Sequence, residues 1–259
     1  RRTQRNPAPK IEAVAAILNI SAYRFTSLKD TAGWRASIHS QAASHGLKGT
    51  VLIADEGINL FIAGTAVSVR AFLAWLTAQT PFAGLPLKES WSEAVPFRKL
   101  IVKVKREIIR MNSPAIRPQD EHAPSVDAAT LSRWLAAGVD DAGRTVVTLD
   151  TRNGFEVDMG RFRGALDWRL ARFGDFPRAL EARRAELEGK TVVSYCTGGI
   201  RCEKAALLMR AAGVANVLQL DGGILKYFEE VGGRHFDGRC FVFDQREGLS
   251  DSLAPAMPV

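Results

Sequence analysis

Cys196 is the residue whose surroundings point most directly to chemistry. It follows the apolar run 192–195 and opens the segment Cys-Thr-Gly-Gly-Ile-Arg-Cys, in which a glycine-rich loop leads into a helix start. The N–H groups of such a loop converge on one point, and the positive end of the helix favours an anion there. A nearby cation, here Arg201, further lowers a thiol pKa that is ordinarily near ~8.5. We predict Cys196 and Arg201 as catalytic residues, in a loop that also contains Thr197, Gly198, Gly199, Ile200 and Cys202.

The spacing within this loop separates two chemistries that use the same geometry. Cysteine phosphatases have their arginine six positions after the nucleophile, so that a wide loop holds phosphate and the arginine binds two oxygens. Here the arginine stands five positions after Cys196, and Tyr195 replaces the histidine that precedes the phosphatase nucleophile. The smaller loop suits a single sulfur or similar atom on the cysteine. A buried cysteine that merely closes a strand is the alternative.

The stretch 196–205 resembles the active-site signature of the rhodanese-domain tRNA uridine-34 hydroxylase family. Other segments carry the same resemblance. Residues 146–156 resemble the opening rhodanese strand with its Asp-x-Arg end, 160–165 resemble the short motif that follows, and 217–224 resemble the last strand and turn. Residues 49–59 match part of the family's N-terminal domain. The similarity spans about residues 12 to 246. This combination is more specific than a lone cysteine loop, because rhodanese domains serve many functions.

The resemblance implies an enzyme, an oxidoreductase that hydroxylates C5 of uridine 34 to 5-hydroxyuridine, with molecular oxygen as co-substrate and the tRNA anticodon region as partner. The chain has no dinucleotide-binding glycine fingerprint, phosphate-binding loop or facial-triad iron motif, so no other cofactor and no metal are expected. Uracil is an electron-poor enone, so the Cys196 thiolate can add at C6 and make C5 attack an electrophilic oxygen donor. Tyr195, Phe155 or Trp168 are candidates to stack on the base, and core packing explains aromatics there equally well.

Two other functions stay open from the residues alone. One is a sulfurtransferase in which Cys196 carries a persulfide, and the other is a non-catalytic RNA-binding module that senses oxidants through Cys196. The second loop cysteine, Cys202, either resolves an oxidised Cys196 or packs the helix onto the sheet. Cys240 stands in a strand-like pattern and is expected to be structural.

Basic residues are concentrated in the first half of the chain. Residues 1–113 contain 16 Lys and Arg against 7 Asp and Glu, whereas residues 114–259 contain 19 against 21. This asymmetry predicts that the first domain docks a polyanion. Within 97–106 an alternating pattern puts lysines on one face and Leu100, Val102 and Val104 on the other. The predicted RNA-binding residues are Lys99, Lys103, Lys105, Arg106 and Arg110, and the alternative is a lysine-protected edge strand.

The fold class predicted for the chain is α/β, with two domains. In the first domain, residues 1–113, the pattern reads strand, helix, strand, strand, helix, strand, at about 13–25, 30–45, 49–54, 58–64, 65–79 and 97–105. This order fits a ferredoxin-like (acylphosphatase-like) α+β sandwich that docks RNA. The segment 55–59 is predicted as its central hairpin turn. The polar residues Asp55, Glu56 and Asn59 are typical of turns, which explains their presence better than a functional role does. Three prolines mark 114–124 as a linker.

The second domain, residues 125–235, is predicted as a rhodanese-like parallel sheet covered on both faces. The predicted order is helix, strand, short strand, helix, strand, helix, strand and short helix. These elements lie at about 126–137, 145–150, 165–168, 175–188, 191–195, 202–212, 216–220 and 224–230. Ligands bind beyond the carboxyl ends of such strands, so Cys196 is expected to share a crevice with nearby Asp150 and Arg152. Asp150 is expected to pair with an arginine or anchor a loop. Residues 236–259 are predicted as a C-terminal extension, partly disordered and without the cysteine-bearing segment that the resemblance implies for relatives.

The cysteines and the apolar runs bear on the compartment. The three cysteines, an odd number and widely spaced apart from the Cys196/Cys202 pair, form neither a disulfide framework nor a zinc pattern, which favours a reducing cytoplasm. No apolar run approaches the ~18 residues of a membrane span, and the arginine-rich start lacks the apolar region of a secretory signal. The missing initiator Met suggests that the numbering starts inside a longer product or after removed residues.

Overall fold

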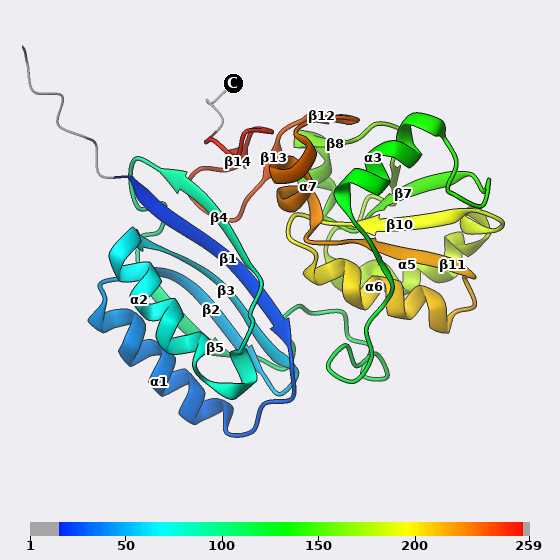
Figure 1. The fold of residues 1–259 in the computed structure, drawn as a ribbon. Coiled ribbons are helices and arrows are strands. Elements are labelled where there is room, and N and C mark those ends of the chain that lie inside the picture. Colours follow the sequence, from blue (N-terminus) through cyan, green and yellow to red (C-terminus); the bar gives the residue numbers. More distant parts are fainter. Residues whose placement is uncertain (1–15, 256–259) are drawn as a thin grey trace, which may run out of the picture.

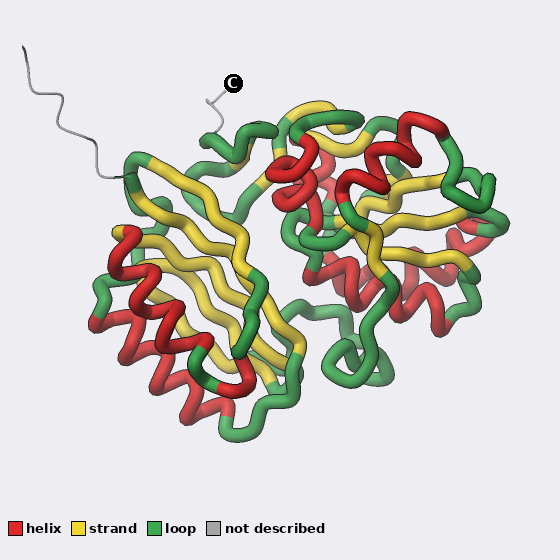
Figure 2. Tube along the Cα trace, viewed as in Figure 1, coloured by secondary structure: helices red, strands yellow, loops and turns green. Residues whose placement is uncertain are grey.

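The computed structural model describes residues 16–255, which form two domains side by side (Figure 1). The first domain contains one five-stranded sheet with two long helices on one face (Figure 2). Its strands are β1 (Ile17–Phe25), β2 (Lys48–Ala54), β3 (Gly57–Thr65), β4 (Leu87–Ser92) and β5 (Leu100–Val104), and its helices are α1 (Thr31–Ser44), α2 (Ala66–Thr77) and the short η1 (Thr80–Phe82). The arrangement confirms the acylphosphatase-like sandwich.

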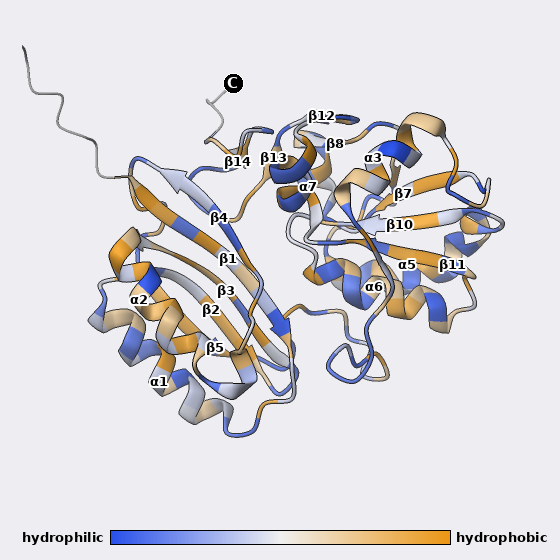
Figure 3. Cartoon of the chain, in the orientation of Figure 1, coloured by the Kyte–Doolittle hydropathy of each residue, from blue (hydrophilic) through white to orange (hydrophobic). Residues whose placement is uncertain are grey.

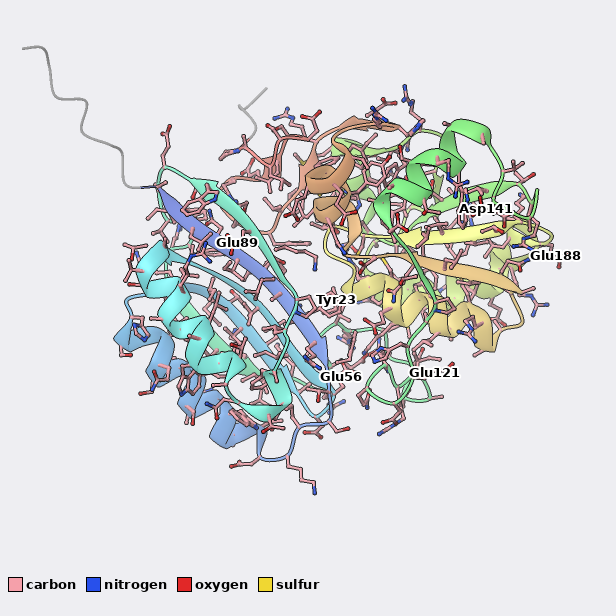
Figure 4. All side chains as sticks on the ribbon, viewed as in Figure 1. Tyr23, Glu56, Glu89, Glu121, Asp141 and Glu188 are labelled. Carbon is pink, nitrogen blue, oxygen red and sulfur yellow. The ribbon has the colours of Figure 1, made fainter. Side chains whose placement is uncertain are left out.

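Alternation along the strands divides this sheet into two unlike faces. The strand order is β4-β1-β3-β2-β5, with β5 parallel to β2 and the other pairs antiparallel. Apolar residues such as Ile20, Val51 and Leu60 pack under α1 and α2 as one core. The opposite face carries polar and aromatic side chains and is turned toward the second domain, as the position of Tyr23 in Figure 4 shows.

The fourth strand of the sandwich is β4, which was not predicted. The sequence pattern predicts four strands, the last of them at about 97–105. A strand does form there, β5, but it is the fifth strand of the sheet. It lies at the β2 edge, while β4 occupies the position beside β1. The predicted hairpin is confirmed, with only Asp55 and Glu56 between β2 and β3.

The second domain is a parallel sheet of order β6-β11-β10-β7-β9 with helices on both faces, which confirms the rhodanese-like prediction. Its strands are β6 (Ser125–Val126), β7 (Val146–Asp150), β8 (Gly160–Phe162), β9 (Leu166–Asp167), β10 (Thr191–Tyr195) and β11 (Asn216–Leu220). Its helices are α3 (Ala128–Ala137), α4 (Gly154–Met159), η2 (Phe173–Asp175), α5 (Phe176–Arg183), η3 (Arg184–Leu187), α6 (Ile200–Ala211) and α7 (Gly223–Val231). Separate apolar cores lie on the two faces, and Figure 3 shows the hydrophobic character of β7 and β11.

The connection between the domains runs from Val104 to Ser125 without a helix or strand of its own. Ile108 packs in a small core shared by the two domains, and Met111 already belongs to the core of the second domain. The predicted division at residue 113 lies inside this connection. The connection is therefore packed against both domains rather than extended between them.

The C-terminal segment returns to the first domain. It contains β12 (Phe236–Gly238), β13 (Cys240–Phe241) and β14 (Gly248–Leu249), with β12 paired to β8. The Gln245 N–H donates to the Pro96 carbonyl at 3.1 Å, and Arg246 donates to Ser90 Oγ at 2.7 Å. Residues 236–255 are thus ordered in the structure, and the remainder of the tail that was predicted as disordered, 256–259, lies outside the described residues.

Two findings concern the described part of the chain as a whole. Between residues 16 and 255, no helix has the length and apolar character needed to cross a membrane. The same residues contain no group of three or more His, Cys, Asp or Glu side chains arranged to hold a metal ion. The Arg-rich start discussed above lies outside the described residues.

Candidate active site

The Cys196 loop joins the carboxyl end of β10 to the start of α6, as predicted. The chain turns sharply at Gly199, whose φ of 100° suits glycine, and the Gly199 N–H donates to Cys196 Sγ at 3.1 Å. The start of α7 fixes the loop from the other side, because Ile224 N–H donates to the Cys196 carbonyl at 3.0 Å. That approach requires Gly223, where a Cβ would lie 2.5 Å from the same carbonyl oxygen. The loop backbone is therefore held at both ends.

The thiol of Cys196 is ionised at neutral pH. Burial alone would raise its pKa, but a hydrogen bond from Cys202, the charge of Arg201 and the N–H groups of both residues lower the pKa to about 5. The side chain is 1% exposed. The charge of Arg201 and the N–H groups are the effects that a loop at a helix start was predicted to have on a thiol, whereas the Cys202 hydrogen bond was not predicted. The result is a shielded, reactive thiolate.

The partner thiol, Cys202, stays protonated. Burial raises its pKa well above the ordinary value, and the neighbouring Cys196 charge raises it further. Its sulfur lies 3.7 Å from Thr151 Oγ1 and it is fully buried. Cys202 therefore donates a hydrogen bond to the thiolate, a role that neither of the two predicted alternatives contained. Whether it also resolves an oxidised Cys196 stays a prediction.

Arg201 acts as a fixed charge. Its guanidinium makes two hydrogen bonds to the carboxylate of Glu156, at 2.6 and 2.8 Å, and both side chains are buried. Burial alone would lower the arginine pKa, but Glu156 raises it, so the group stays charged. Glu156 therefore holds the guanidinium in place, and the charge of Arg201 lowers the pKa of the Cys196 thiol.

Asp150 and Arg152 do not share the crevice of Cys196, contrary to the prediction. They form a buried ion pair in which Arg152 Nη2 lies 2.6 Å from Asp150 Oδ2 and also donates to the Gly160 carbonyl. Both side chains are 0% exposed and neither lines the cavity described below. The pairing of Asp150 with an arginine, predicted as its structural role, is confirmed. Cys240 is buried in the second core, where burial raises its pKa to about 12.

A cavity of about 430 Å³ opens in front of the Cys196 loop, between the two domains. The loop supplies Cys196, Thr197 and Gly198, and the C-terminal segment supplies side chains that include Phe243 and Arg246. A large part of the wall is the helix-free face of the first sheet, with Asn19, Ser21, Tyr23, Thr50, Leu52, Asn59, Phe61, Lys88 and Ser90. The site is therefore built jointly by both domains, which the sequence patterns did not predict.

The three aromatic residues predicted to stack on a base do not line this cavity. Tyr195 is 0% exposed and packs edge-on against Phe162 in the second core. Trp168 stacks on a core phenylalanine, whereas Phe155 is half exposed outside the cavity next to Phe243. Core packing, the alternative interpretation, accounts for the first two. The aromatics that do line the cavity are Tyr23, Phe61, Phe97, Phe173 and Phe243.

The basic residues predicted to bind RNA lie around β5. Lys99, Lys103, Lys105 and Arg106 are exposed, and Arg110 reaches the cavity wall. Within the described sheet β5 pairs only with β2, so it is an edge strand as the alternative interpretation required. Lys103 is also the register partner of Leu52, which lines the cavity, so the lysines share the open face of the sheet. RNA binding by this group stays a prediction.

Three residues that shape the site were not found from the sequence. Glu156 had a usable signal, because an Asn-x-x-Glu spacing at 153–156 is typical of a helix start, and its carboxylate accepts from Asn153 N–H at 3.1 Å. Lys88 and Lys204 had none. Lys204 is 2% exposed on α6 and binds Glu56 and Glu107, each at 2.8 Å, across the domain boundary. Glu56 is labelled in Figure 4, at the side of the first domain that faces the second.

The fold and the thiolate loop define a protein of the rhodanese class that carries an additional acylphosphatase-like domain. A family model described as "UPF0176 acylphosphatase like domain" matches residues 17–108, and one described as "Rhodanese-like domain" matches residues 131–230. Among solved structures, the rhodanese-like domain of an Anabaena protein is similar over 52% of this chain and 87% of its own, with 22% identity and a TM-score of 0.37.

More specifically, the chain belongs to the tRNA uridine(34) hydroxylase family. A protein of that name from Bordetella petrii is 61% identical over 241 residues, which cover 93% of this chain and 96% of the relative. Another from Variovorax paradoxus is 60% identical over 238 residues, covering 92% of this chain and 90% of the relative. The family resemblance identified from the sequence motifs is confirmed.

Proposed function

We propose that this protein hydroxylates C5 of uridine 34 in tRNA, the activity carried in the name of its relatives, and that Cys196 is the catalytic nucleophile. The observation that supports this most is a thiolate of pKa about 5 at the wall of a cavity shared by both domains. A substrate that is tRNA implies a cytoplasmic location. Molecular oxygen, implied by the family resemblance, is the proposed co-substrate.

The cavity suits a single extruded base. Its volume of about 430 Å³ falls in the range typical of small-molecule sites, and aromatic rings on its wall offer faces for stacking. Uridine 34 lies in a single-stranded loop, where a base can be turned outward at little cost. We therefore propose that the uracil enters between the first sheet and the Cys196 loop.

The chemistry that follows is a conjugate addition. The thiolate forms a bond to C6 of uracil, and the electrons of the C5–C6 double bond move toward C5 and the O4 oxygen. The enolate carbon C5 then attacks one oxygen atom of a hydroperoxide, which forms from molecular oxygen and two reducing equivalents. The O–O bond breaks, and the second oxygen atom leaves as water or an alcohol. Loss of the C5 proton and cleavage of the sulfur–carbon bond restore the double bond and release the thiolate unchanged.

A sulfurtransferase is the second candidate, because a buried thiolate within a rhodanese-like domain can also hold a persulfide sulfur. In that case Cys196 bonds to sulfur and never to the base. If the protein is instead a redox-sensing RNA-binding module, deleting its gene changes no tRNA nucleoside. The three functions therefore differ in the nucleosides that depend on the protein.

Mass spectrometry of tRNA nucleosides from a strain lacking the gene tests the proposal. Wild-type protein should restore 5-hydroxyuridine derivatives, Cys196→Ser should restore none, and Cys240→Ala, a change outside the loop, should restore them. If thiolated nucleosides are lost without the gene, the protein is a sulfurtransferase and not a hydroxylase. If no nucleoside changes, the remaining function is that of an RNA-binding module that senses oxidants.

A further inference from the structure

Lys88 reaches the active-site loop from the opposite domain. It lies on β4 opposite Ser21 of β1, and both side chains line the cavity. A Cβ built on Gly198 would lie 4.0 Å from Lys88 Cδ, so the lysine stem passes over the loop. The Lys88 ammonium is 5.3 Å from the centre of the Tyr23 ring, which supports it by a cation–π contact.

Tyr23 in turn contacts the loop, because a Cβ on Gly199 would lie 2.9 Å from its hydroxyl. The two side chains therefore cover the glycines that follow Cys196. Burial lowers the pKa of Lys88, while the negative charge of Cys196 raises it. Among the charges that act on this lysine, the Cys196 thiolate has the largest effect, which agrees with the place of Lys88 above the loop.

Lys88 forms no ion pair among residues 16–255, although the charges of Asp221 and Glu229 also act on it. Other cations of the cavity wall are already engaged, since Arg201 binds Glu156 and Arg246 binds Asp244. Arg172 pairs with an aspartate, and Arg110 donates to Asn112. A half-buried ammonium that forms no direct ion pair, beside a thiolate and facing a cavity, is a group placed to meet negative charge on a ligand.

Building on the proposed hydroxylation, we propose that Lys88 is a catalytic residue that binds the O4 oxygen of uracil and stabilises the enolate formed when Cys196 adds at C6. During that step the sulfur gains a bond to carbon, its negative charge moves to O4, and nothing is oxidised or reduced. The ammonium donates a hydrogen bond to O4 throughout. After C5 takes one oxygen atom from the hydroperoxide, whose O–O bond breaks to release water or an alcohol, the C5 proton leaves and the charge returns to sulfur.

This assignment explains why the catalytic loop is paired with a second domain. Lys88 and Tyr23 both belong to the first sheet, so the rhodanese-like domain alone supplies Arg201 beside the thiolate but lacks this second cation above the loop. Packing of the two domains completes the site. The group that Lys88 is proposed to bind is the oxygen of an enolised carbonyl. A phosphate of the RNA backbone is the other anion that Lys88 could bind, and the experiment must distinguish the two.

The test compares Lys88→Met, Lys88→Arg and the control Lys226→Met, which removes an α7 lysine that does not line the cavity. Single-turnover rates are measured with an anticodon stem-loop, and its affinity is measured at several salt concentrations. Lys88→Met should slow the chemical step about 10²-fold, as loss of one oxyanion donor does. Its affinity and salt dependence should stay near those of the wild type, and Lys88→Arg should recover part of the rate.

A second readout does not depend on hydroxylation. The pH midpoint for alkylation of Cys196 should rise in Lys88→Met, because the thiolate loses a nearby cation, and stay unchanged in Lys226→Met. A wild-type rate in Lys88→Met, or an unchanged alkylation midpoint, overturns the assignment. Weaker binding with a flatter salt dependence and an unchanged rate would instead make Lys88 a phosphate contact. Product formed by the wild-type protein in the same assay tests the hydroxylase proposal separately.

Discussion

At the scale of single residues, the thiolate depends on a neighbouring thiol as well as on a positive charge. Cys202 is protonated and donates to Cys196, so removing the donor should raise the Cys196 pKa. A hydrogen bond to a charged group contributes about 1.5–3 kcal/mol, which corresponds to about one to two pH units. We predict that the midpoint for Cys196 alkylation, near pH 5 in the wild type, rises by this amount in Cys202→Ala.

The matched control is Cys202→Ser, whose hydroxyl keeps a donor in the same place. Alkylation followed by peptide mass spectrometry across pH 4 to 9 gives both midpoints. Equal midpoints in the alanine and serine variants would contradict a role for the Cys202 hydrogen bond. Arg201→Ala is a poorer test, because it leaves the buried Glu156 carboxylate without a partner.

The same residue scale shows what could be predicted of the site. Cys196, Arg201 and their loop lie in one short segment, and their relation follows from local geometry at a helix start. Lys88 could not be found in this way, because only the packing of the two domains brings β4 to the loop. The stacking aromatics were misassigned for the same reason, since distant parts of the chain supply the cavity's rings, with Tyr23 and Phe61 on the first sheet, Phe173 in the second domain and Phe243 in the C-terminal segment.

At the scale of elements, Lys204 connects α6 to the β2–β3 turn and to the interdomain connection. Its ammonium is 2% exposed and binds Glu56, Glu107 and the Ile109 carbonyl. Lys204→Met should lower the free energy of unfolding by about 3 kcal/mol, because it leaves two carboxylates without their cation. Urea unfolding at neutral pH measures the change.

The triple variant Lys204→Met, Glu56→Gln, Glu107→Gln provides the control. Removing the carboxylate charges together with the cation should restore much of the lost free energy. If the single and triple variants are equally unstable, the cluster acts through packing of the lysine stem. A wild-type free energy in the single variant would show that the cluster contributes nothing to stability.

The elements also show the limit of sequence patterns. The apolar runs of β7, β10 and β11 and the Asp55–Glu56 hairpin were predicted, because burial and turn chemistry are local signals. The missed strand β4 has the sequence Leu-Lys-Glu-Ser-Trp-Ser, whose side chains are exposed or half-buried throughout. Its strand character comes from pairing with β1 at the sheet edge, a contact between distant parts of the chain.

At the scale of the whole molecule, excess positive charge lies on the first domain, whose open sheet face forms one side of the cavity. Lys99, Lys103 and Lys105 continue the open face of the first sheet, so an RNA strand leaving the cavity across that face would meet them. Each Lys→Ala change should flatten the slope of log affinity against log salt by about 0.7–0.9. Binding of an anticodon stem-loop, measured by fluorescence anisotropy, provides the slope.

Arg70→Ala is the control for this prediction, because Arg70 is an exposed basic residue on α2, in the helix layer on the opposite face. It should leave the slope near the wild-type value. A variant in which Lys99, Lys103 and Lys105 are all changed to Ala provides the strictest test. If its slope of log affinity against log salt equals that of the wild type, β5 is only a lysine-protected edge strand. An equal effect of Arg70→Ala would indicate non-specific attraction by net charge.

The central claim is that the Cys196 thiolate bonds directly to the base in the interdomain cavity. An anticodon stem-loop with 5-fluorouridine at position 34 tests it, because C5 then carries no proton to lose and the thiolate cannot be expelled to restore the double bond. The wild-type protein should form a covalent complex in which mass spectrometry locates the RNA on Cys196, and Cys196→Ser should form none. Normal hydroxylation of uridine without any adduct from the fluorinated RNA, and with sulfane sulfur on Cys196, would contradict the account.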